Sequence, residues 1–546
     1  MSVTGDAAAF EARTCLRDIA AIIDADLGRA NVIAERALSK GLRHPAFHKT
    51  RALWFQSQNR HADALDEFRQ AAALAPHDVN LLDAVGLGLV RLDRAAAAIP
   101  VFDAAIRIAP AWAQLHYHKG CAHAVIGEPA AAIRCHERAV ALQPDHVDAL
   151  TAVAAATARV GETKKARAFA ERALKLVPDN PTAVIALATC DLHDRQFERA
   201  ERRLDALLVQ LHPEDPTRAL TLGLLGDALD GQNRVAEAFM AFSSKNNILR
   251  TLNESRFSES ARALNFVERL TGDFKRTSPR PWERTAGTAS VPHSRQHVFL
   301  LGFMRSGTTL LEQALASHPD VEDLEERETL KDLAARYLGN PESLRELSVL
   351  NGDLLAEAQN YYWNCVRAFG ARPEGKIFVE KQPFNTLYLP LIARLFPEAR
   401  IIFSLRDPRD VVLSCFRRHL EIKTTTFEVL TLAGAARFYD RVMRLAGAYR
   451  SGLSLDLCDF RYEDMIRDFD GSVRSICGFI GLSWNESMRD FDRTARTRSV
   501  RSPSAHQVRR GLYADGIGQW RRYQKELSPI LPILKPWIER FGYALD

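Results

Sequence analysis

The chain has 546 residues, of which 47% are hydrophobic, 26% charged and 8% aromatic. These fractions are typical of a folded globular protein and exclude disordered, collagen-like and disulfide-scaffold classes. The formal net charge is +5, from 73 Lys and Arg against 68 Asp and Glu. That charge is too weakly basic to indicate nucleic-acid binding, but it suits anionic small molecules or acidic protein segments.

The cysteines and the apolar runs indicate the expected compartment. Eight cysteines are spread along the chain without a CxxC or metal-finger spacing, so we expect reduced thiols packed as small hydrophobes. No basic start followed by an apolar run is visible, and no stretch of about 18 apolar residues occurs, so we expect neither a signal peptide nor a membrane span. The expected location is cytoplasmic.

The N-terminal half repeats with a period of 34 residues. The positions that share this period are the prolines Pro76, Pro110, Pro144 and Pro178, the alanines Ala64, Ala98, Ala132, Ala166 and Ala200, and the small residues Ala52, Gly86, Gly120, Ala154 and Ala188. Each unit is predicted to form two helices, which approach closely at the small residues and end before the Pro. A single unit cannot bury its apolar face, so the units must stack into a superhelix.

This pattern resembles the tetratricopeptide repeat over about residues 45–245, with a degenerate unit around Ala30–Pro45 expected to cap the start. The resemblance implies an all-α solenoid, taken as residues 1–274, whose concave surface binds protein or peptide. Residues 275–296 contain three Pro and clustered Ser and Thr without an apolar period, which predicts a linker.

Residues 297–546 are predicted to form an α/β domain. Short apolar runs alternate with helical stretches here, at residues 297–301, 377–380, 400–405 and 455–460. This alternation is typical of a parallel sheet that is covered on both faces.

The first apolar run leads into a Gly-rich loop and a helix, with Gly302 and Gly307 at the spacing of the nucleoside-triphosphate P-loop. Backbone N–H groups at such a loop and at the following helix start bind phosphate or sulfate. Thr308 stands where that P-loop has its Lys, and Arg305 supplies a cation earlier. The loop therefore predicts an oxyanion site and argues against a nucleotide kinase or triphosphatase.

A second phosphate site is predicted after the run at 400–405. Asp407 can cap a helix that begins with Pro408, while Arg406 lies at the carboxyl end of a strand, where ligands of open α/β sheets collect. Ser414 follows about two turns into the helix. A guanidinium and a hydroxyl can grip one phosphate together.

The stretch MRSGTTLLEQALASHPDV, which begins at Met304, resembles the phosphosulfate loop of the sulfotransferase superfamily that uses 3′-phosphoadenosine 5′-phosphosulfate (PAPS). The resemblance spans about residues 297–525 and is nearest to the protein-tyrosine sulfotransferase branch, which includes chains with tetratricopeptide repeats. It implies a P-loop-like fold, with PAPS as co-substrate and without a metal. The PAPS contacts that it implies are Arg305, Ser306, Gly307, Thr308, Thr309, Arg406, Ser414, Tyr462, Trp520, Arg521 and Arg522.

The same resemblance implies the catalytic residues. The branch has a Gly-Glu-Glu-Thr-Arg stretch whose second Glu is the base, and Glu326 matches it, although the surrounding acids could instead form a solvated helix start. Lys381 matches a Lys that contacts the sulfuryl oxygens, and Arg305 adds positive charge. Ser504 matches a Ser near the leaving group, with Ser502 as the alternative register.

We therefore expect a PAPS-dependent sulfotransferase in which Glu326 deprotonates an acceptor hydroxyl. A protein tyrosine is the expected acceptor, with a glycan, a lipid or a small hydroxyl compound left open. The main alternative is a repeat scaffold whose α/β domain senses a nucleotide without catalysis. Turnover of PAPS distinguishes the two hypotheses.

Overall fold

The computed structural model describes residues 3–258, 262–277, 282, 293–497, 511–512 and 515–545. The chain divides into two compact units, Met1–Asp194 and Arg195–Asp546. The division falls inside the predicted repeat array, so the second unit contains the last repeat helices together with the α/β domain. Much of the predicted linker at 275–296 lies outside the described residues.

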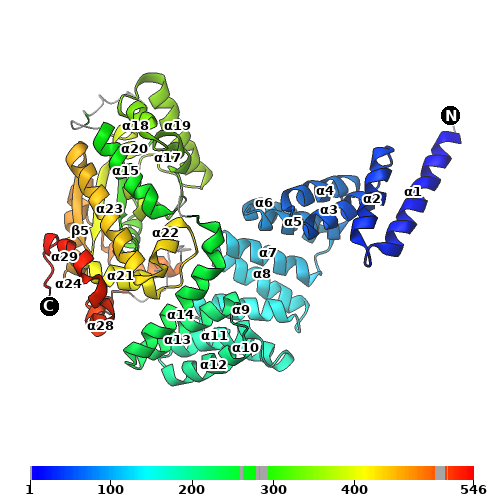
Figure 1. The fold of residues 1–546 in the computed structure, drawn as a ribbon, viewed down its shortest axis with the longest axis horizontal. Helices are drawn as coiled ribbons and strands as arrows, with labels where there is room; N and C mark the ends of the chain where they lie inside the picture. Colours follow the sequence, from blue (N-terminus) through cyan, green and yellow to red (C-terminus); the bar gives the residue numbers. More distant parts are fainter. Residues whose placement is uncertain are drawn as a thin grey trace. The chain divides into compact units, whose positions relative to one another are not determined.

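The first unit consists of helices in the described residues, and the pairs follow the predicted period (Figure 1). They are α1 Val3–Ile22, α2 Leu27–Ser39, α3 Pro45–Ser57, α4 His61–Leu74, α5 Val79–Arg91, α6 Ala95–Ile108, α7 Ala113–Val125, α8 Pro129–Leu142, α9 Val147–Val160, α10 Thr163–Leu176 and α11 Pro181–His193. The helices α4, α6, α8 and α10 each end two residues before a periodic Pro, as predicted.

The small periodic residues are where paired helices touch. A Cβ on Gly86 would lie 2.4 Å from the ring of Phe102. A Cβ on Gly120 would lie equally close, at 2.4 Å, to the ring of His136. A ring therefore fills the space that each glycine leaves, which confirms the predicted packing of small against large residues.

The two-helix pattern continues along the chain into the second unit, where a Cβ on Gly226 would lie 2.4 Å from the ring of Phe242. The helices of this part are α12 Phe197–Gln210, α13 Pro216–Gly231, α14 Val235–Asn253 and α15 Ala263–Thr277, with the 3₁₀ turn η1 Glu254–Arg256.

The α/β domain alternates strands and helices, as predicted. Its elements are β1 Gln296–Gly302, α16 Thr308–Ala316, β2 Val321–Leu324, α17 Lys331–Tyr337, α18 Pro341–Ser348, α19 Gly352–Ala368, β3 Ile377–Lys381, η3 Pro383–Tyr388, α20 Leu389–Leu395, β4 Arg400–Leu405, α21 Pro408–Arg417, α22 Thr424–Phe427, η4 Glu428–Leu430, α23 Leu432–Gly452, β5 Asp456–Arg461, α24 Tyr462–Arg467, α25 Phe469–Ile480, η5 Glu486–Met488, α26 Phe491–Thr497, η6 Gln519–Tyr523, α28 Gln524–Leu527, η7 Ser528–Ile530 and α29 Leu531–Arg540.

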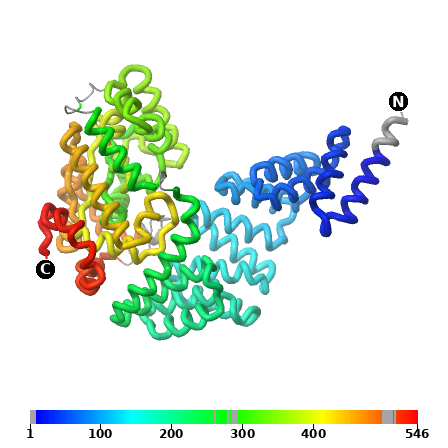
Figure 2. The backbone as a smooth tube through the Cα atoms, in the orientation of Figure 1, coloured from blue at the N-terminus to red at the C-terminus, as the bar shows by residue number. Residues whose placement is uncertain are grey.

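The five strands form one parallel sheet in the order β2-β3-β1-β4-β5. Alternate residues of each strand point to opposite faces. On one face Phe299 and Phe403 join a core with α15, α19, α21 and α23, and on the other Leu300 and Ile402 join a core with α16 and α25. Figure 2 traces the backbone of this domain, which runs from green through yellow to red. The carboxyl ends of β1, β3 and β4 therefore meet at one edge, where the predicted site residues follow the strands.

The edge strand β2 is absent from the sequence-based prediction. Val321 and Leu324 are buried at its ends, whereas Glu322 and Asp323 between them are only half-buried. An acid-rich run of four residues does not show the apolar run or the alternation by which strands are predicted. Among the described helices, none is both long and apolar enough to cross a membrane.

Candidate active site

The Gly-rich loop between β1 and α16 depends on glycine at two positions. Gly302 has a φ of +149°, and a Cβ there would lie 2.7 Å from the backbone oxygen of Ser404. Gly307 has a φ of +93°, and a Cβ there would lie 2.4 Å from the ring of Tyr462. Arg305 has a φ of 68°, which is uncommon for a residue with a side chain and occurs where the surroundings enforce it. The loop is therefore packed tightly against β4 and α24.

The loop leads directly into the first turn of α16. The side chains of Ser306, Thr308 and Thr309 are 2%, 3% and 4% exposed, so they are part of the packed loop rather than of a solvated surface. The first N–H groups of a helix have no partner within the helix, and the helix dipole makes this end positive. The loop and the start of α16 thus form the kind of cradle in which proteins bind oxyanions.

The two predicted phosphate sites lie next to each other. Arg305 donates from Nε to the Ser414 hydroxyl at 3.0 Å. Arg406 donates from Nη1 to the backbone oxygen of Arg305 at 2.9 Å, and the Ser404 hydroxyl donates to the backbone oxygen of Ser306 at 2.7 Å. These bonds join the loop after β1 to the strand β4 and the helix α21, so both motifs contribute to one cationic surface.

Tyr462 supports this surface from α24. Its side chain is buried, and the Arg406 guanidinium lies 4.8 Å from the centre of its ring, a cation–π contact. Burial raises the pKa of the Tyr462 hydroxyl. Arg406 itself is 8% exposed, and among the residues that the structure describes none accepts a hydrogen bond from its Nε. A buried guanidinium N–H without an acceptor is costly, and an anionic ligand would supply one.

Lys381 lies at the end of β3 between two carboxylates. Its Nζ is 2.7 Å from Oε1 of Glu326 and 3.3 Å from Oε2 of Glu312. The side chains of Lys381 and Glu312 are fully buried, whereas that of Glu326 is 30% exposed. Glu312 belongs to α16, the helix whose first turn forms the oxyanion cradle. The predicted base and the predicted sulfuryl-contacting Lys are therefore brought into direct contact.

Burial and charge act in opposite directions on this cluster. Burial alone would lower the pKa of Lys381, but Glu312 and Glu326 together raise it above the usual range of a lysine. Burial raises the pKa of Glu312 well above its usual range, although Lys381 lowers it. Lys381 is therefore held as an ammonium, whereas burial favours the neutral form of Glu312 and the ammonium beside it opposes this effect.

A second buried carboxylate fixes the segment that follows Glu326. Glu380, on β3, accepts hydrogen bonds from Thr329 at 2.8 Å and from Asn385 at 2.5 Å. Tyr362 of α19 also donates its hydroxyl to Glu380. Burial raises the pKa of Glu380 to about 7. The Glu380 carboxylate thus anchors Thr329, three residues after the predicted base, to the sheet.

The start of α21 is built from charged side chains that are buried. Asp407 caps the helix through a bond from the backbone N–H of Arg409 at 2.9 Å, and the Arg409 guanidinium returns to the same carboxylate at 2.8 Å. Arg409 also stacks on Trp520, with its guanidinium carbon 3.5 Å from the ring centre. Trp520 is 2% exposed, so in this structure it packs in the core against Arg409.

The other predicted C-terminal contacts, Arg521 and Arg522, have neighbours of their own in this structure. Arg521 lies over the ring of Trp520, at 4.9 Å. Arg522 pairs with Asp230 of α13 at 3.0 Å. Ser504 lies outside the described residues, as does its alternative Ser502. The structure thus brings together the loop residues, Arg406, Ser414, Tyr462, Lys381 and Glu326, but it directs Arg522 toward the repeat helices.

Asp410 connects α21 to the C-terminal segment. It accepts hydrogen bonds from the backbone N–H groups of Gly518 at 2.7 Å and Trp520 at 2.9 Å. Burial raises the pKa of this carboxyl to about 6, because these bonds and the positive charge of Arg406 only partly offset the loss of water.

Replacing Asp410 with Asn should change how thermal stability depends on pH. The folded-state pKa of about 6 lies above the ordinary value of 3.8, so the Asp410 carboxyl adds stability below pH 4 that is lost as the pH rises through 6. The loss amounts to about 3 kcal/mol. Asn carries no charge, so the melting temperature of the wild type should fall relative to that of Asp410→Asn between pH 4 and pH 7.5.

Thermal unfolding across this pH range measures the difference. Asp464→Asn, which removes an exposed carboxylate of α24, is the matched control and should show little change. A melting-temperature difference between Asp410→Asn and the wild type that is the same at every pH would contradict the prediction.

Sequence reasoning missed Glu312, Glu380 and Asp410. Glu312 lies among apolar residues in the helix after the loop, where an acid at a buried position is the only available signal. Glu380 ends an apolar strand directly before Lys381, and Asp410 follows the helix cap. Each is a carboxylate at a position that the secondary-structure prediction buries, so a search for buried acids near strand ends could have found them.

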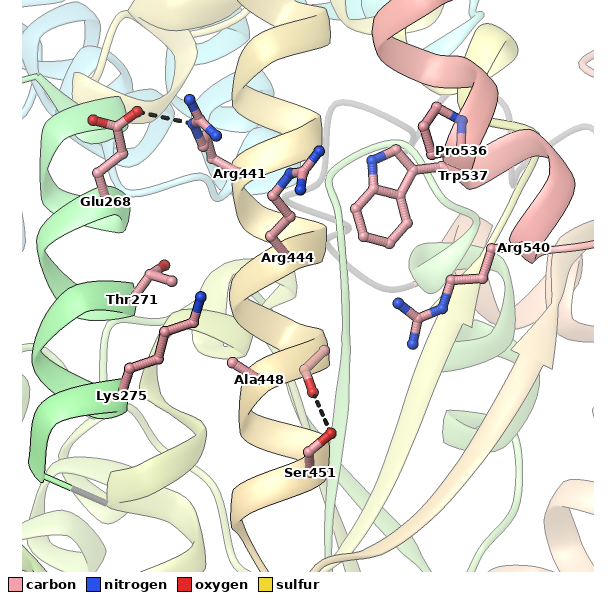
Figure 3. Close-up of a pocket in the computed structure, with 11 residues that line it drawn as sticks. Glu268, Thr271, Lys275, Arg441, Arg444, Ala448, Ser451, Pro536, Trp537 and Arg540 are labelled. Atoms are coloured by element: carbon pink, nitrogen blue, oxygen red, sulfur yellow. Dashed lines mark hydrogen bonds and ion pairs between the residues drawn. The ribbon is translucent and has the colours of Figure 1, made fainter. Parts of the chain in front are cut away.

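A separate groove of about 900 Å³ lies on the outer helices α15, α23 and α29 (Figure 3). Its basic lining residues are Lys275, Arg441, Arg444 and Arg540. Arg441 is paired with Glu268 at 2.8 Å, and Arg444 is paired with Asp440 at 2.9 Å. The groove contains none of the predicted site residues, so we place the candidate active site by the convergence of charged groups at the strand ends rather than by cavity size.

Comparisons with known proteins match the α/β part and the repeat part of the chain to different families. Residues 297–486 match the sulfotransferase family. Residues 117–181 and 157–213 match tetratricopeptide repeats.

Relatives with similar sequences are distant. An uncharacterized protein of Aquifex aeolicus is 28% identical over 270 residues, which cover 47% of this chain and 34% of the relative. Protein-tyrosine sulfotransferase 1 of Danio rerio is 23% identical over 260 residues, which cover 45% of this chain and 72% of that protein. A solved tetratricopeptide repeat protein from Parabacteroides merdae is 14% identical, with a TM-score of 0.37 over 44% of this chain and 93% of that one. The chain thus spans about a third of the length of the Aquifex relative.

Proposed function

We propose that this chain, in which a sulfotransferase-family domain follows tetratricopeptide repeats, transfers a sulfuryl group from PAPS to an acceptor hydroxyl. The observation that carries the proposal is that the two groups of predicted site residues lie at one edge of the sheet. The oxyanion loop with Arg305, Ser414 and Arg406 lies at the same sheet edge as the Lys381–Glu326 pair.

The residues present fit a donor with several anionic groups. The buried Nε of Arg406 has no hydrogen-bond partner in the described part of the chain. The loop needs glycine at Gly302 and Gly307 to pack as closely as it does, and α16 begins at the loop. Arg305, the loop N–H groups and the first turn of α16 would hold the phosphosulfate, and Arg406 with Ser414 would hold the 3′-phosphate. PAPS supplies the sulfuryl group and leaves as 3′,5′-adenosine bisphosphate.

Glu326 is the proposed base. Its carboxylate takes the proton of the acceptor hydroxyl while the hydroxyl oxygen bonds to sulfur and the bond from sulfur to the bridging phosphate oxygen breaks. Lys381 and Arg305 stabilise the charge on the transferring and leaving oxygens, and Ser504 is proposed to assist them. The proton of the acceptor hydroxyl ends on the Glu326 carboxylate, and the negative charge leaves on the bridging phosphate oxygen, so the charges balance.

The contact between Lys381 and Glu326 suggests how binding prepares the base. Lys381 is paired with Glu326 at 2.7 Å. An anionic donor would compete with Glu326 for the ammonium, and the Glu326 carboxylate would then be released to face the acceptor hydroxyl. Glu312 keeps the ammonium charged throughout, since it remains at 3.3 Å behind it.

We propose a protein tyrosine as the acceptor. The Glu326 motif resembles that of the protein-tyrosine branch, and a repeat array is suited to binding an extended peptide. A full-length protein incubated with PAPS labelled in the sulfuryl group, together with tyrosine peptides and with simple phenols, sugars and lipids, tests the donor and the acceptor separately. Formation of 3′,5′-adenosine bisphosphate with label on a peptide would support the proposal. Nucleotide binding without any turnover would favour a sensing scaffold instead.

Replacing Arg406 with Ala should weaken nucleotide binding rather than abolish the chemistry. The variant loses a guanidinium next to the proposed 3′-phosphate position, and a charge-assisted hydrogen bond of this kind is worth about 1.5–3 kcal/mol. We therefore expect the dissociation constant for 3′,5′-adenosine bisphosphate to rise by about ten- to a hundredfold, as measured by calorimetry. Arg467→Ala, at an exposed Arg of α24, is the control. Wild-type affinity in Arg406→Ala would remove this residue from the site.

A further inference from the structure

The last repeat hairpin, α13 and α14, reaches into the α/β domain within one compact unit. Lys245 of α14 is fully buried. Its ammonium donates to the backbone oxygens of Phe416 at 3.2 Å, Arg417 at 2.9 Å and Arg418 at 3.0 Å. The neighbouring Asn246 donates from Nδ2 to the same oxygen of Phe416 at 3.0 Å. One lysine of the repeat array therefore binds three consecutive carbonyls of the α/β domain.

These carbonyls end α21, the helix that carries Ser414. The last carbonyls of a helix have no partner within it and carry partial negative charge. An ammonium has three N–H donors, and all three of Lys245 are used here. Burial lowers the pKa of Lys245 to about 7, although Asp227 acts against this. A buried charge of this kind is tolerated because the helix end accepts its hydrogen bonds.

A second contact joins the same hairpin to the C-terminal segment. Asp230, at the end of α13, accepts from Arg417 at 2.6 Å, from Arg522 at 3.0 Å and from the Tyr523 hydroxyl at 2.8 Å. Arg417 is the last residue of α21, whereas Arg522 and Tyr523 belong to η6. Asp230 therefore holds the helix end and the C-terminal segment together.

The C-terminal segment connects this contact with the proposed phosphate site. Gly518 and Trp520 donate their backbone N–H groups to Asp410 in the first turn of α21. Gly516 accepts a hydrogen bond from Arg406. The repeat hairpin thus contacts α21 at its carboxyl end directly and meets the amino end through residues 515–523.

We propose that Lys245 and Asp230 are positioning residues for the 3′-phosphate site, and that the last repeat hairpin is part of the donor-binding machinery rather than a tethered module. The inference rests on the proposed function. Lys245 sets where α21 ends, and this fixes the Ser414 hydroxyl relative to Arg305. Asp230 sets where the C-terminal segment lies, and this fixes the Gly516 carbonyl that orients Arg406. Both residues act on the binding of PAPS, and neither touches the hydroxyl substrate.

Lys245→Met tests the proposal in the full-length protein. The variant removes the ammonium that binds the carbonyls of Arg417 and Arg418, while Phe416 keeps its bond from Asn246. The dissociation constant for 3′,5′-adenosine bisphosphate and the KM for PAPS should therefore both rise about tenfold. The kcat at saturating PAPS and the KM for the acceptor should stay within about twofold. The matched control is Arg234→Gln at the N-cap of the same helix, because Arg234 pairs only with repeat residues, Glu201 and Glu237, in the part of the chain that the structure describes.

Asp230→Asn keeps the proposal testable if Lys245→Met fails to fold. The Asn retains an oxygen for Tyr523 but loses the charge that faces Arg417 and Arg522, so we expect the same pattern at about threefold. Nucleotide affinity equal to that of the wild type in the folded variants would overturn the inference, as would a fall in kcat with unchanged nucleotide affinity. A wild-type protein that binds no 3′,5′-adenosine bisphosphate would instead overturn the proposed function, and this inference with it.

Discussion

Glu326→Gln should reduce sulfuryl transfer by about a hundred- to ten-thousandfold, the usual contribution of a general base. The amide has nearly the shape of the carboxylate but cannot take the proton from the hydroxyl of the substrate. The site around it should persist, because Lys381 keeps Glu312 at 3.3 Å as its partner. Single-turnover assays with labelled PAPS measure the chemical step, and calorimetry with 3′,5′-adenosine bisphosphate should give wild-type affinity.

The neighbouring Glu328 provides the matched control for this experiment. Its carboxylate is 48% exposed and pairs with Lys331 at 3.0 Å, so Glu328→Gln removes an acid from the same segment without touching Lys381. We expect nearly normal transfer in this variant. Full transfer in Glu326→Gln would remove the base assignment, and equal losses in both variants would show that the segment's overall charge matters instead.

Lys381→Met should abolish transfer and also destabilise the α/β domain. The substitution leaves Glu312 buried without its counter-charge, and breaking a buried pair in this way typically costs about 3–5 kcal/mol. Because burial already raises the pKa of Glu312, the carboxyl can take up a proton, so the loss of stability should be smaller at pH 5 than at pH 8. Thermal unfolding at both pH values, beside the transfer assay, measures the two effects.

The double variant Lys381→Met with Glu312→Gln separates stability from catalysis. Removing the unpaired buried charge should recover most of the melting temperature, whereas transfer should stay abolished because the Lys381 ammonium no longer faces the sulfuryl oxygens. A double variant as unstable as Lys381→Met alone would contradict the assigned role of Glu312. Measurable transfer in either variant would contradict that of Lys381.

How far the sequence predicts this molecule depends on how local each signal is. The repeat period is a local pattern, and the Gly86–Phe102 contact shows why its positions are restricted to small and large residues. The loop from Gly302 to Thr309 is equally local, because a tight turn before a helix needs specific residues at neighbouring positions. These parts could be predicted from the chain alone.

The remaining parts of the site depend on contacts between distant segments. Lys245 binds backbone carbonyls. Every residue has a backbone carbonyl, so no sequence pattern around Phe416 or Arg418 indicates that a lysine binds there. Arg522 resembles a nucleotide contact by its position in the sequence, but in the structure it pairs with Asp230, which lies 292 residues earlier in the chain. Such pairings follow from the fold and have no counterpart in the spacing of residues.

The place where the two compact units part has a consequence for how such chains can diverge. The boundary between Asp194 and Arg195 falls inside the repeat unit that α11 and α12 form. Whole repeats upstream of it can be gained or lost in steps of 34 residues without altering any residue that touches α21 or the C-terminal segment. The hairpin of α13 and α14 has no such freedom, since Asp230 and Lys245 are committed to the domain that follows. Copy number should therefore vary at the amino-terminal side among related chains, while the final pair is inherited together with the sulfotransferase-family domain.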